Sequence, residues 1–170
     1  MELWDLYTAD KQPIGKTMVR GEERPEGCYN LAVSVWIRDK DGKYLISQRA
    51  ASKNSYPLMW ETVAGGVVAG ETSLQGAVRE VKEEVGLDID KESLRLVFTQ
   101  SGINWGDKFY REIMDVYLYE FDGSYDEKRA VSDEVAQSKW LTSDEIHLYF
   151  EEGKMIPVLS DIFDRVHAVR

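Results

Sequence analysis

Cysteine is nearly absent from this chain, since Cys28 is the only one among its 170 residues. A lone cysteine has no partner within the chain, which excludes a framework of internal disulfides. The N-terminus also lacks the basic segment and apolar run of a secretory signal, and no apolar stretch is long enough to span a membrane. We therefore expect a protein of the reducing cytoplasm that has no membrane partner.

Basic residues are also in short supply. The chain has 21 Lys and Arg against 31 Asp and Glu, which gives a net charge of −10. So acidic a surface argues against binding to a nucleic acid polymer or an anionic membrane, because like charges repel. A small anionic ligand stays open, because a local cluster of metal and basic side chains overrides the global sign.

Internal repeats and low-complexity segments are missing too. A length of 170 residues, of which 43% are hydrophobic, suits one domain with its own core. We expect a single domain over residues 1–170, in which residues 1–27 form an N-terminal hairpin and linker and residues 28–170 form the core.

Strands and helices alternate irregularly along the chain. Apolar alternation and turn residues predict strands over residues 2–7, 14–19, 30–38, 43–48, 60–63, 94–100, 109–121 and 134–141. Capping residues and helical periodicity predict helices over residues 73–85, 142–150 and 157–166. Strands mixed with so few helices favour an α/β sandwich with a mixed β-sheet between helical layers.

The most informative stretch runs from Gly65 to Leu87 and begins with a glycine-rich loop. Thr72 and Gln75 have the spacing of a capping box, which predicts a helix that starts near residue 73. Gly86 stands where a left-handed C-terminal cap would end that helix. Glycines before the helix allow close approach of the backbone and leave a carbonyl available.

Three carboxylates crowd one turn of this helix. At about 100° per residue, Glu80, Glu83 and Glu84 fall on one arc beside the apolar face. Like charges at this spacing destabilise a helix, and Arg79 offsets only one of them. A divalent cation over Glu80 and Glu84 would explain the arrangement, because carboxylate oxygens are the natural ligands of Mg²⁺ or Mn²⁺.

The same stretch resembles the Nudix box, G-x5-E-x7-R-E-U-x-E-E-x-G-U, in which U is an aliphatic residue. The fixed positions are all filled without a gap, by Gly65, Glu71, Arg79, Glu80, Val81, Glu83, Glu84, Gly86 and Leu87. The resemblance implies the Nudix α/β/α sandwich. It also implies a hydrolase that cleaves a diphosphate linked to another moiety, with a bound metal ion and a carboxylate that deprotonates the attacking water.

The resemblance further assigns the site residues. The implied ligands of Mg²⁺ or Mn²⁺ are the Gly65 carbonyl, Glu80, Glu83 and Glu84. Arg79 is expected to orient Glu83, and Glu71 to anchor the loop. Two residues are candidates for the acid–base role: Glu83 itself, and Glu112 in a later strand.

A second resemblance concerns the segment before the glycine loop. Arg49 and Lys53 have the R-x3-K spacing of the type I isopentenyl-diphosphate isomerases and their hydrolase relatives, whose basic pair contacts the substrate diphosphate. Two cations that converge on a phosphate beside the metal would serve the same purpose here. Trp105, in the expected loop 102–107, either stacks on a nucleotide base or packs against the core.

Isomerase activity is therefore the main alternative to hydrolysis. The isomerases need a cysteine and two histidines where this chain has Ala64, Gly66 and Asn30, whereas Glu112 matches one of their metal-site glutamates. Losing the cysteine while keeping the carboxylates favours a hydrolase. A nucleotide-sensing module without catalysis is the third hypothesis. The Nudix box of such modules is usually degraded, whereas the box in this chain is intact.

The expected substrate is a nucleoside-diphosphate-type compound or another small organic diphosphate. If the protein is a homodimer, we expect the N-terminal hairpin to pair between subunits.

Overall fold

A computed structural model describes residues 2–105, 108–127 and 132–169. Its helices and strands, in chain order, are β1 (Leu3–Tyr7), β2 (Pro13–Val19), β3 (Tyr29–Asp39), β4 (Tyr44–Arg49), β5 (Trp60–Glu61), β6 (Val63–Gly66), α1 (Ser73–Val85), the 3-10 turn η1 (Lys91–Ser93), β7 (Leu94–Trp105), β8 (Lys108–Phe121), β9 (Val135–Leu141), α2 (Ser143–Glu151) and α3 (Leu159–His167).

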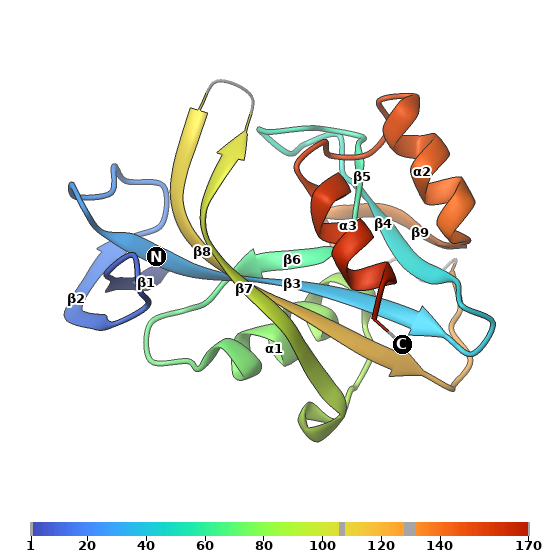
Figure 1. Ribbon diagram of the computed structural model, residues 1–170, viewed down its shortest axis with the longest axis horizontal. Coiled ribbons are helices and arrows are strands. Elements are labelled where there is room, and N and C mark those ends of the chain that lie inside the picture. The colour runs from blue at the N-terminus through green and yellow to red at the C-terminus, as the bar shows by residue number, and fades with distance from the viewer. Residues whose placement is uncertain (1, 106–107, 128–131, 170) are drawn as a thin grey trace.

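Strand β3 is the centre of a nine-stranded mixed sheet (Figure 1). It pairs in parallel with β8 and antiparallel with β1, β4 and β6. Such a strand is covered on both faces, and its residues 30–37 are all buried. Its sequence from residue 31 to residue 37 is apolar except for Ser34, which suits this position because neither face meets water.

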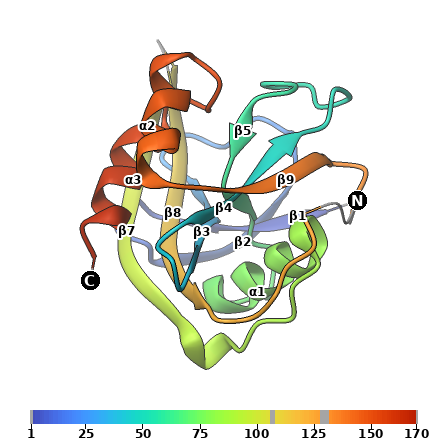
Figure 2. The same cartoon turned by 90° about the vertical axis from the view of Figure 1, so that its right-hand side faces the viewer.

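Two cores lie on opposite faces of the sheet, and the side chains of β3 alternate between them. Val33 and Val35 pack with Ala77 and Val81 of α1. Trp36 points the other way and packs with Phe163 of α3, their ring centroids 5.1 Å apart. Figure 2 shows α1 and α3 on the two sides of this sheet. The predicted α/β sandwich is thus confirmed. Separately, none of the described helices is long and apolar enough to cross a membrane.

The predicted N-terminal hairpin is present, since β1 and β2 pair antiparallel. It is fastened to the glycine loop by two hydrogen bonds, from the Ala69 N–H to the Leu3 carbonyl (2.8 Å) and from the Gly70 N–H to Asp5 Oδ2 (2.8 Å). A third connection joins Lys11 to the buried carboxylate of Asp115 on β8. The hairpin is therefore part of the wall around the loop that precedes α1.

Two expectations about strands need correction. The predicted strand 60–63 is two short strands, because the chain crosses from β4 to β3 at Thr62, whose buried hydroxyl donates to the Val35 carbonyl (2.5 Å). The strand that begins at residue 94 continues to Trp105, where we expected a loop. A register shift near Gly102, which has a φ of 76°, lets pairing with β8 resume at Ile103.

Candidate active site

Helix α1 forms where the sequence predicts it, and local capping explains both ends. The Thr72 hydroxyl accepts from the Gln75 N–H while the Gln75 side chain accepts from the Thr72 N–H, which completes the predicted capping box. Gly86 ends the helix in the left-handed region at a φ of 69°. These local contacts fix where the helix begins and ends, and helical geometry then sets which of its side chains share a face.

The glycine loop brings the backbone of β6 against two side chains. A Cβ added at Gly65 would lie 2.2 Å from the carboxyl carbon of Glu80, and one added at Gly66 would lie 2.6 Å from the indole nitrogen of Trp4. Neither glycine has a positive φ, so the requirement is space and not backbone conformation. Residue 65 must lack a side chain for the Glu80 carboxylate to rest on the main chain.

Arg79 ties the loop to the helix. Its Nε donates to Glu71 (3.0 Å), its Nη2 to the Gly66 carbonyl (2.9 Å), and its Nη1 to both Glu80 (2.7 Å) and Glu83 (3.1 Å). A planar guanidinium can satisfy this many acceptors at fixed angles, which lysine cannot. Arg79 thus reaches Glu83 as the sequence suggested, and it also binds Glu80 and the loop.

Glu84 is the buried acid of the helix, although it is only one turn from Glu80. Its side chain lies inside the protein, 8% exposed, and its Oε2 has no hydrogen-bond partner among the described residues. The carboxyl accepts a hydrogen bond from the Ala64 N–H. Burial, together with the charges of Glu61 and Glu80, holds the pKa of Glu84 well above its ordinary value.

Glu61 is the site residue that the sequence analysis missed. It lies on β5, is 8% exposed, and faces Arg49, whose Nη1 donates to it at 2.8 Å. Burial raises the pKa of Glu61, and the Arg49 charge opposes that effect. A polar residue in the predicted strand 60–63 carries little periodic signal, because that strand is so short. Only the crossing at Thr62 places Glu61 beside Glu84.

The acids of α1 do not meet at one point, contrary to the crowding that the helical wheel predicts. Within the described residues, no three His, Cys, Asp or Glu side chains converge as a complete ion site. The reason is that Arg79 occupies oxygens of Glu80 and Glu83, while Glu84 turns inward. The donors nevertheless suit a hard divalent ion, because Glu84 keeps an unpartnered carboxylate oxygen beside two further acids.

A cleft of about 560 Å³ collects most of the predicted side chains. Arg49, Lys53, Gly65, Glu80, Glu83 and Glu84 all line it, together with Arg20 and Glu134 from other parts of the chain. Both members of the predicted basic pair, Arg49 and Lys53, already bind protein partners. Arg49 holds Glu61 and the Ser55 carbonyl, and Lys53 forms an ion pair with Glu134 at 2.6 Å.

Glu112 faces a second hollow, of about 270 Å³, that shares Arg49, Ala64 and Gly65 with the cleft. Asn30 donates to Glu112 at 3.2 Å, and burial raises the pKa of that carboxyl. Ala64 stands where an isomerase needs its cysteine, and Cys28 lines neither hollow. The side chain of Trp105 lies outside the described residues, so its stacking role stays a prediction.

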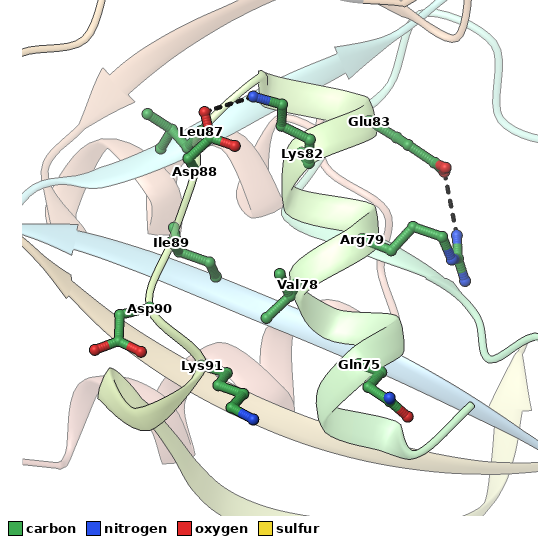
Figure 3. A pocket seen from close by; sticks show the side chains of 10 residues that line it. All are labelled: Gln75, Val78, Arg79, Lys82, Glu83, Leu87, Asp88, Ile89, Asp90 and Lys91. Carbon is green, nitrogen blue, oxygen red and sulfur yellow. Dashed lines mark hydrogen bonds and ion pairs between the residues drawn. The ribbon is translucent and has the colours of Figure 1, made fainter.

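A third hollow, of about 570 Å³, lies on the other side of α1, between the helix and residues 87–91 (Figure 3). Val78 and Ile89 face each other across it, and Lys82 turns outward to an ion pair with Asp88 at 2.5 Å. Arg79 and Glu83 stand at its edge. This hollow lacks Glu84, the buried acid that lines the cleft.

Comparison with known proteins assigns the chain and its fold to one family. The NUDIX domain matches residues 29–162. An uncharacterized Nudix hydrolase of Listeria monocytogenes is 32% identical over 99% of this chain and 97% of that protein. An isopentenyl-diphosphate Delta-isomerase of Serratia proteamaculans is 29% identical over 72% of this chain and 68% of the isomerase. The crystal structure of DR0079 from Deinococcus radiodurans has the same fold, with a TM-score of 0.71 at 20% identity over 99% of this chain and 100% of that one. The chain therefore belongs to the Nudix family and is a Nudix hydrolase, an enzyme that acts on diphosphate bonds.

Proposed function

We propose that this chain is a metal-dependent pyrophosphohydrolase that cleaves the diphosphate linkage of a nucleoside-diphosphate-type compound or another small organic diphosphate. The observation that carries the proposal is the unpartnered, buried Oε2 of Glu84 beside Glu61 and Glu80. A buried carboxylate without a partner is costly, so it is best explained by a cation that binds there.

The residues proposed to hold Mg²⁺ or Mn²⁺ are Glu80, Glu83, Glu84 and the Gly65 carbonyl, with Glu61 next to them. When bound, such an ion draws charge from the phosphate oxygens and lowers the pKa of bound water. Exclusion of a side chain at residue 65 keeps the Glu80 carboxylate against the backbone. This supports the assignment of Gly65 to the same site.

Glu83 is the favoured base among the two acids that the sequence suggests. Its side chain is 58% exposed, lines the cleft, and is held by Arg79. In the proposed step, a water oxygen attacks one phosphorus, the bond to the bridging oxygen breaks, and Glu83 takes the water proton. Glu112 is less suited, because it lines the second hollow and not the cleft that holds Glu80 and Glu84.

Arg49 and Lys53 are proposed to face the substrate diphosphate, with Trp105 against its organic group. Lys53 would exchange Glu134 for phosphate, and that exchange is inexpensive because the side chain of Glu134 is 55% exposed. We also propose that the active unit is one domain over residues 1–170. The homodimer remains a proposal, in which the edge strand β2 would pair between subunits.

A panel of diphosphates tests the activity. Nucleoside diphosphate derivatives, dinucleotides and other organic diphosphates are incubated with Mg²⁺ or Mn²⁺, and the phosphate-containing products of each reaction are separated and measured. Glu84→Gln is expected to lose at least about 100-fold in rate, while Glu151→Gln, an exposed change on α2, is expected to match the wild type. Equal turnover by Glu84→Gln and the wild type would refute the site.

The same protein is assayed for interconversion of isopentenyl and dimethylallyl diphosphates. We expect no isomerisation, because Ala64 offers no thiol and Cys28 is outside both hollows. Isomerisation without phosphate release would replace the proposed hydrolysis with the alternative activity.

A further inference from the structure

Arg20 stands at the junction of the two hollows beside the acids. It lines both the cleft of Glu80 and Glu84 and the second hollow of Glu112. It follows directly after strand β2, in the N-terminal segment that precedes the matched NUDIX domain. The hairpin therefore brings a cation from outside that domain to the edge of the proposed diphosphate site.

The other cations of the cleft are committed to protein partners. Arg79 donates to four acceptors, and Arg49 is only 14% exposed in its pair with Glu61. Lys53 is 21% exposed in its pair with Glu134. Lys82 is half exposed but turns away to Asp88, as Figure 3 shows. Among the described residues that line the cleft, only Lys53 of these four has a partner that substrate displaces readily, and the Lys53 side chain is itself mostly buried.

The Arg20 side chain is more exposed than those of Arg49, Lys53 and Arg79. Its side chain is 50% exposed, and its ion pair is with Glu2 at 3.0 Å, itself 33% exposed. An exposed ion pair of this kind contributes little to the stability of the protein, so replacing Glu2 by a phosphate as the partner of Arg20 costs little free energy. A guanidinium also binds two phosphate oxygens at once, which makes it the better partner for a diphosphate.

Neighbouring side chains hold Arg20 in place while leaving that exchange open. Glu2 accepts from Arg20 with one oxygen and from the indole N–H of Trp4 with the other, at 2.9 Å. The Arg20 guanidinium also lies over the Trp4 ring, 5.9 Å from its centroid. Trp4 in turn packs on Gly66, so Arg20 is positioned relative to the glycine loop itself.

We infer that Arg20 binds a phosphate oxygen of the substrate at the junction of the two hollows, and that Glu2 is the carboxylate it leaves when substrate enters. This inference rests on the proposed function. It makes the N-terminal hairpin part of the substrate-binding site, and it assigns Arg20 as a residue that determines affinity for the diphosphate.

Binding of imidodiphosphate, a diphosphate that resists hydrolysis, tests the inference in the presence of Mg²⁺. Calorimetry compares the full-length wild type with Arg20→Ala, Glu2→Gln and Lys16→Ala. Lys16 is an exposed lysine of strand β2 that lines neither hollow, so its removal controls for net charge. Unfolding temperatures show whether each variant keeps its fold, and Glu84→Gln tests the metal site separately.

Arg20→Ala is expected to weaken binding about 10- to 100-fold, the loss of one charge-assisted contact, whereas Lys16→Ala leaves it within about twofold. Glu2→Gln should tighten binding, because it releases Arg20 and removes a negative charge. If Glu2→Gln weakens binding as much as Arg20→Ala, the pair is merely structural and the inference is wrong. If Arg20→Ala equals Lys16→Ala while Glu84→Gln loses binding, Arg20 alone is refuted. If the wild type does not bind, or Glu84→Gln binds equally well, the proposed function falls as well.

Discussion

Replacing Glu84 by glutamine should make the metal-free protein more stable while it abolishes activity. The carboxylate of Glu84 is buried, accepts one hydrogen bond from the Ala64 N–H, and leaves Oε2 without a partner among the described residues. It also lies near the charges of Glu61 and Glu80. Glutamine has almost the same shape and still offers an acceptor to Ala64, but it carries no charge to bury.

The size of the gain follows from these contacts. A buried polar group without a partner costs about 1–3 kcal/mol, and a charged one costs more, so we take this range as the cost that the amide removes. For a protein of this length, 1 kcal/mol shifts the midpoint of thermal unfolding by about 2–4 °C. We therefore expect Glu84→Gln to unfold about 2–10 °C above the wild type in EDTA.

Adding Mg²⁺ should reverse the order. An ion that binds only the folded state at about 1,000 times its Kd stabilises the protein by about 4.1 kcal/mol, which exceeds the gain expected for the variant. The wild type gains this stability and Glu84→Gln does not, because the variant lacks the charged ligand. Calorimetric or fluorescence unfolding with and without Mg²⁺ measures both arms, and Glu151→Gln serves as the surface control.

The reasoning fails if Glu84→Gln in EDTA unfolds at or below the temperature of the wild type while Glu151→Gln is unchanged. That result would mean that the Glu84 carboxylate is adequately satisfied in the folded protein. No unpartnered buried charge would then need a cation to stabilise it, and the main support for the metal site would be lost.

Three further predictions concern other parts of the site and helix. Gly65→Ala should reduce phosphate release at least about tenfold with little change in unfolding temperature, because the new methyl group displaces the flexible end of Glu80 and not the backbone. Glu112→Gln should gain stability relative to the wild type as pH rises from about 4.3 through the raised folded-state pKa of that carboxyl. Below that pH range the protonated acid and the amide are equivalent, so chemical unfolding at several pH values should show a difference in stability that widens with pH. A constant difference would contradict the raised pKa. Thr72→Ala should lower the free energy of unfolding by about 0.5–2 kcal/mol through loss of the capping box with Gln75, and an unchanged denaturation midpoint would show that the cap is dispensable.

Local features of the site could be read from the sequence because they depend on near neighbours. The capping box at Thr72, the stop at Gly86 and the reach from Arg79 to Glu83 are all contacts within four residues, and each is present. Helical geometry alone sets which of these side chains lie on one face. The same geometry does not set the rotamer, which is why Glu84 turned inward when a shared patch was expected.

What the amino-acid order determined by itself was the family, the helix with its caps, and the set of acids beside a glycine loop. Tertiary structure decided the rest, because strand register and crossings bring together residues that are distant in the chain. The step from β4 to β3 at Thr62 sets Glu61 beside Glu84, and docking of the N-terminal hairpin on the loop sets Arg20 at the edge of the cleft. No local pattern carries such information, since it arises only when each strand pairs with its own neighbour.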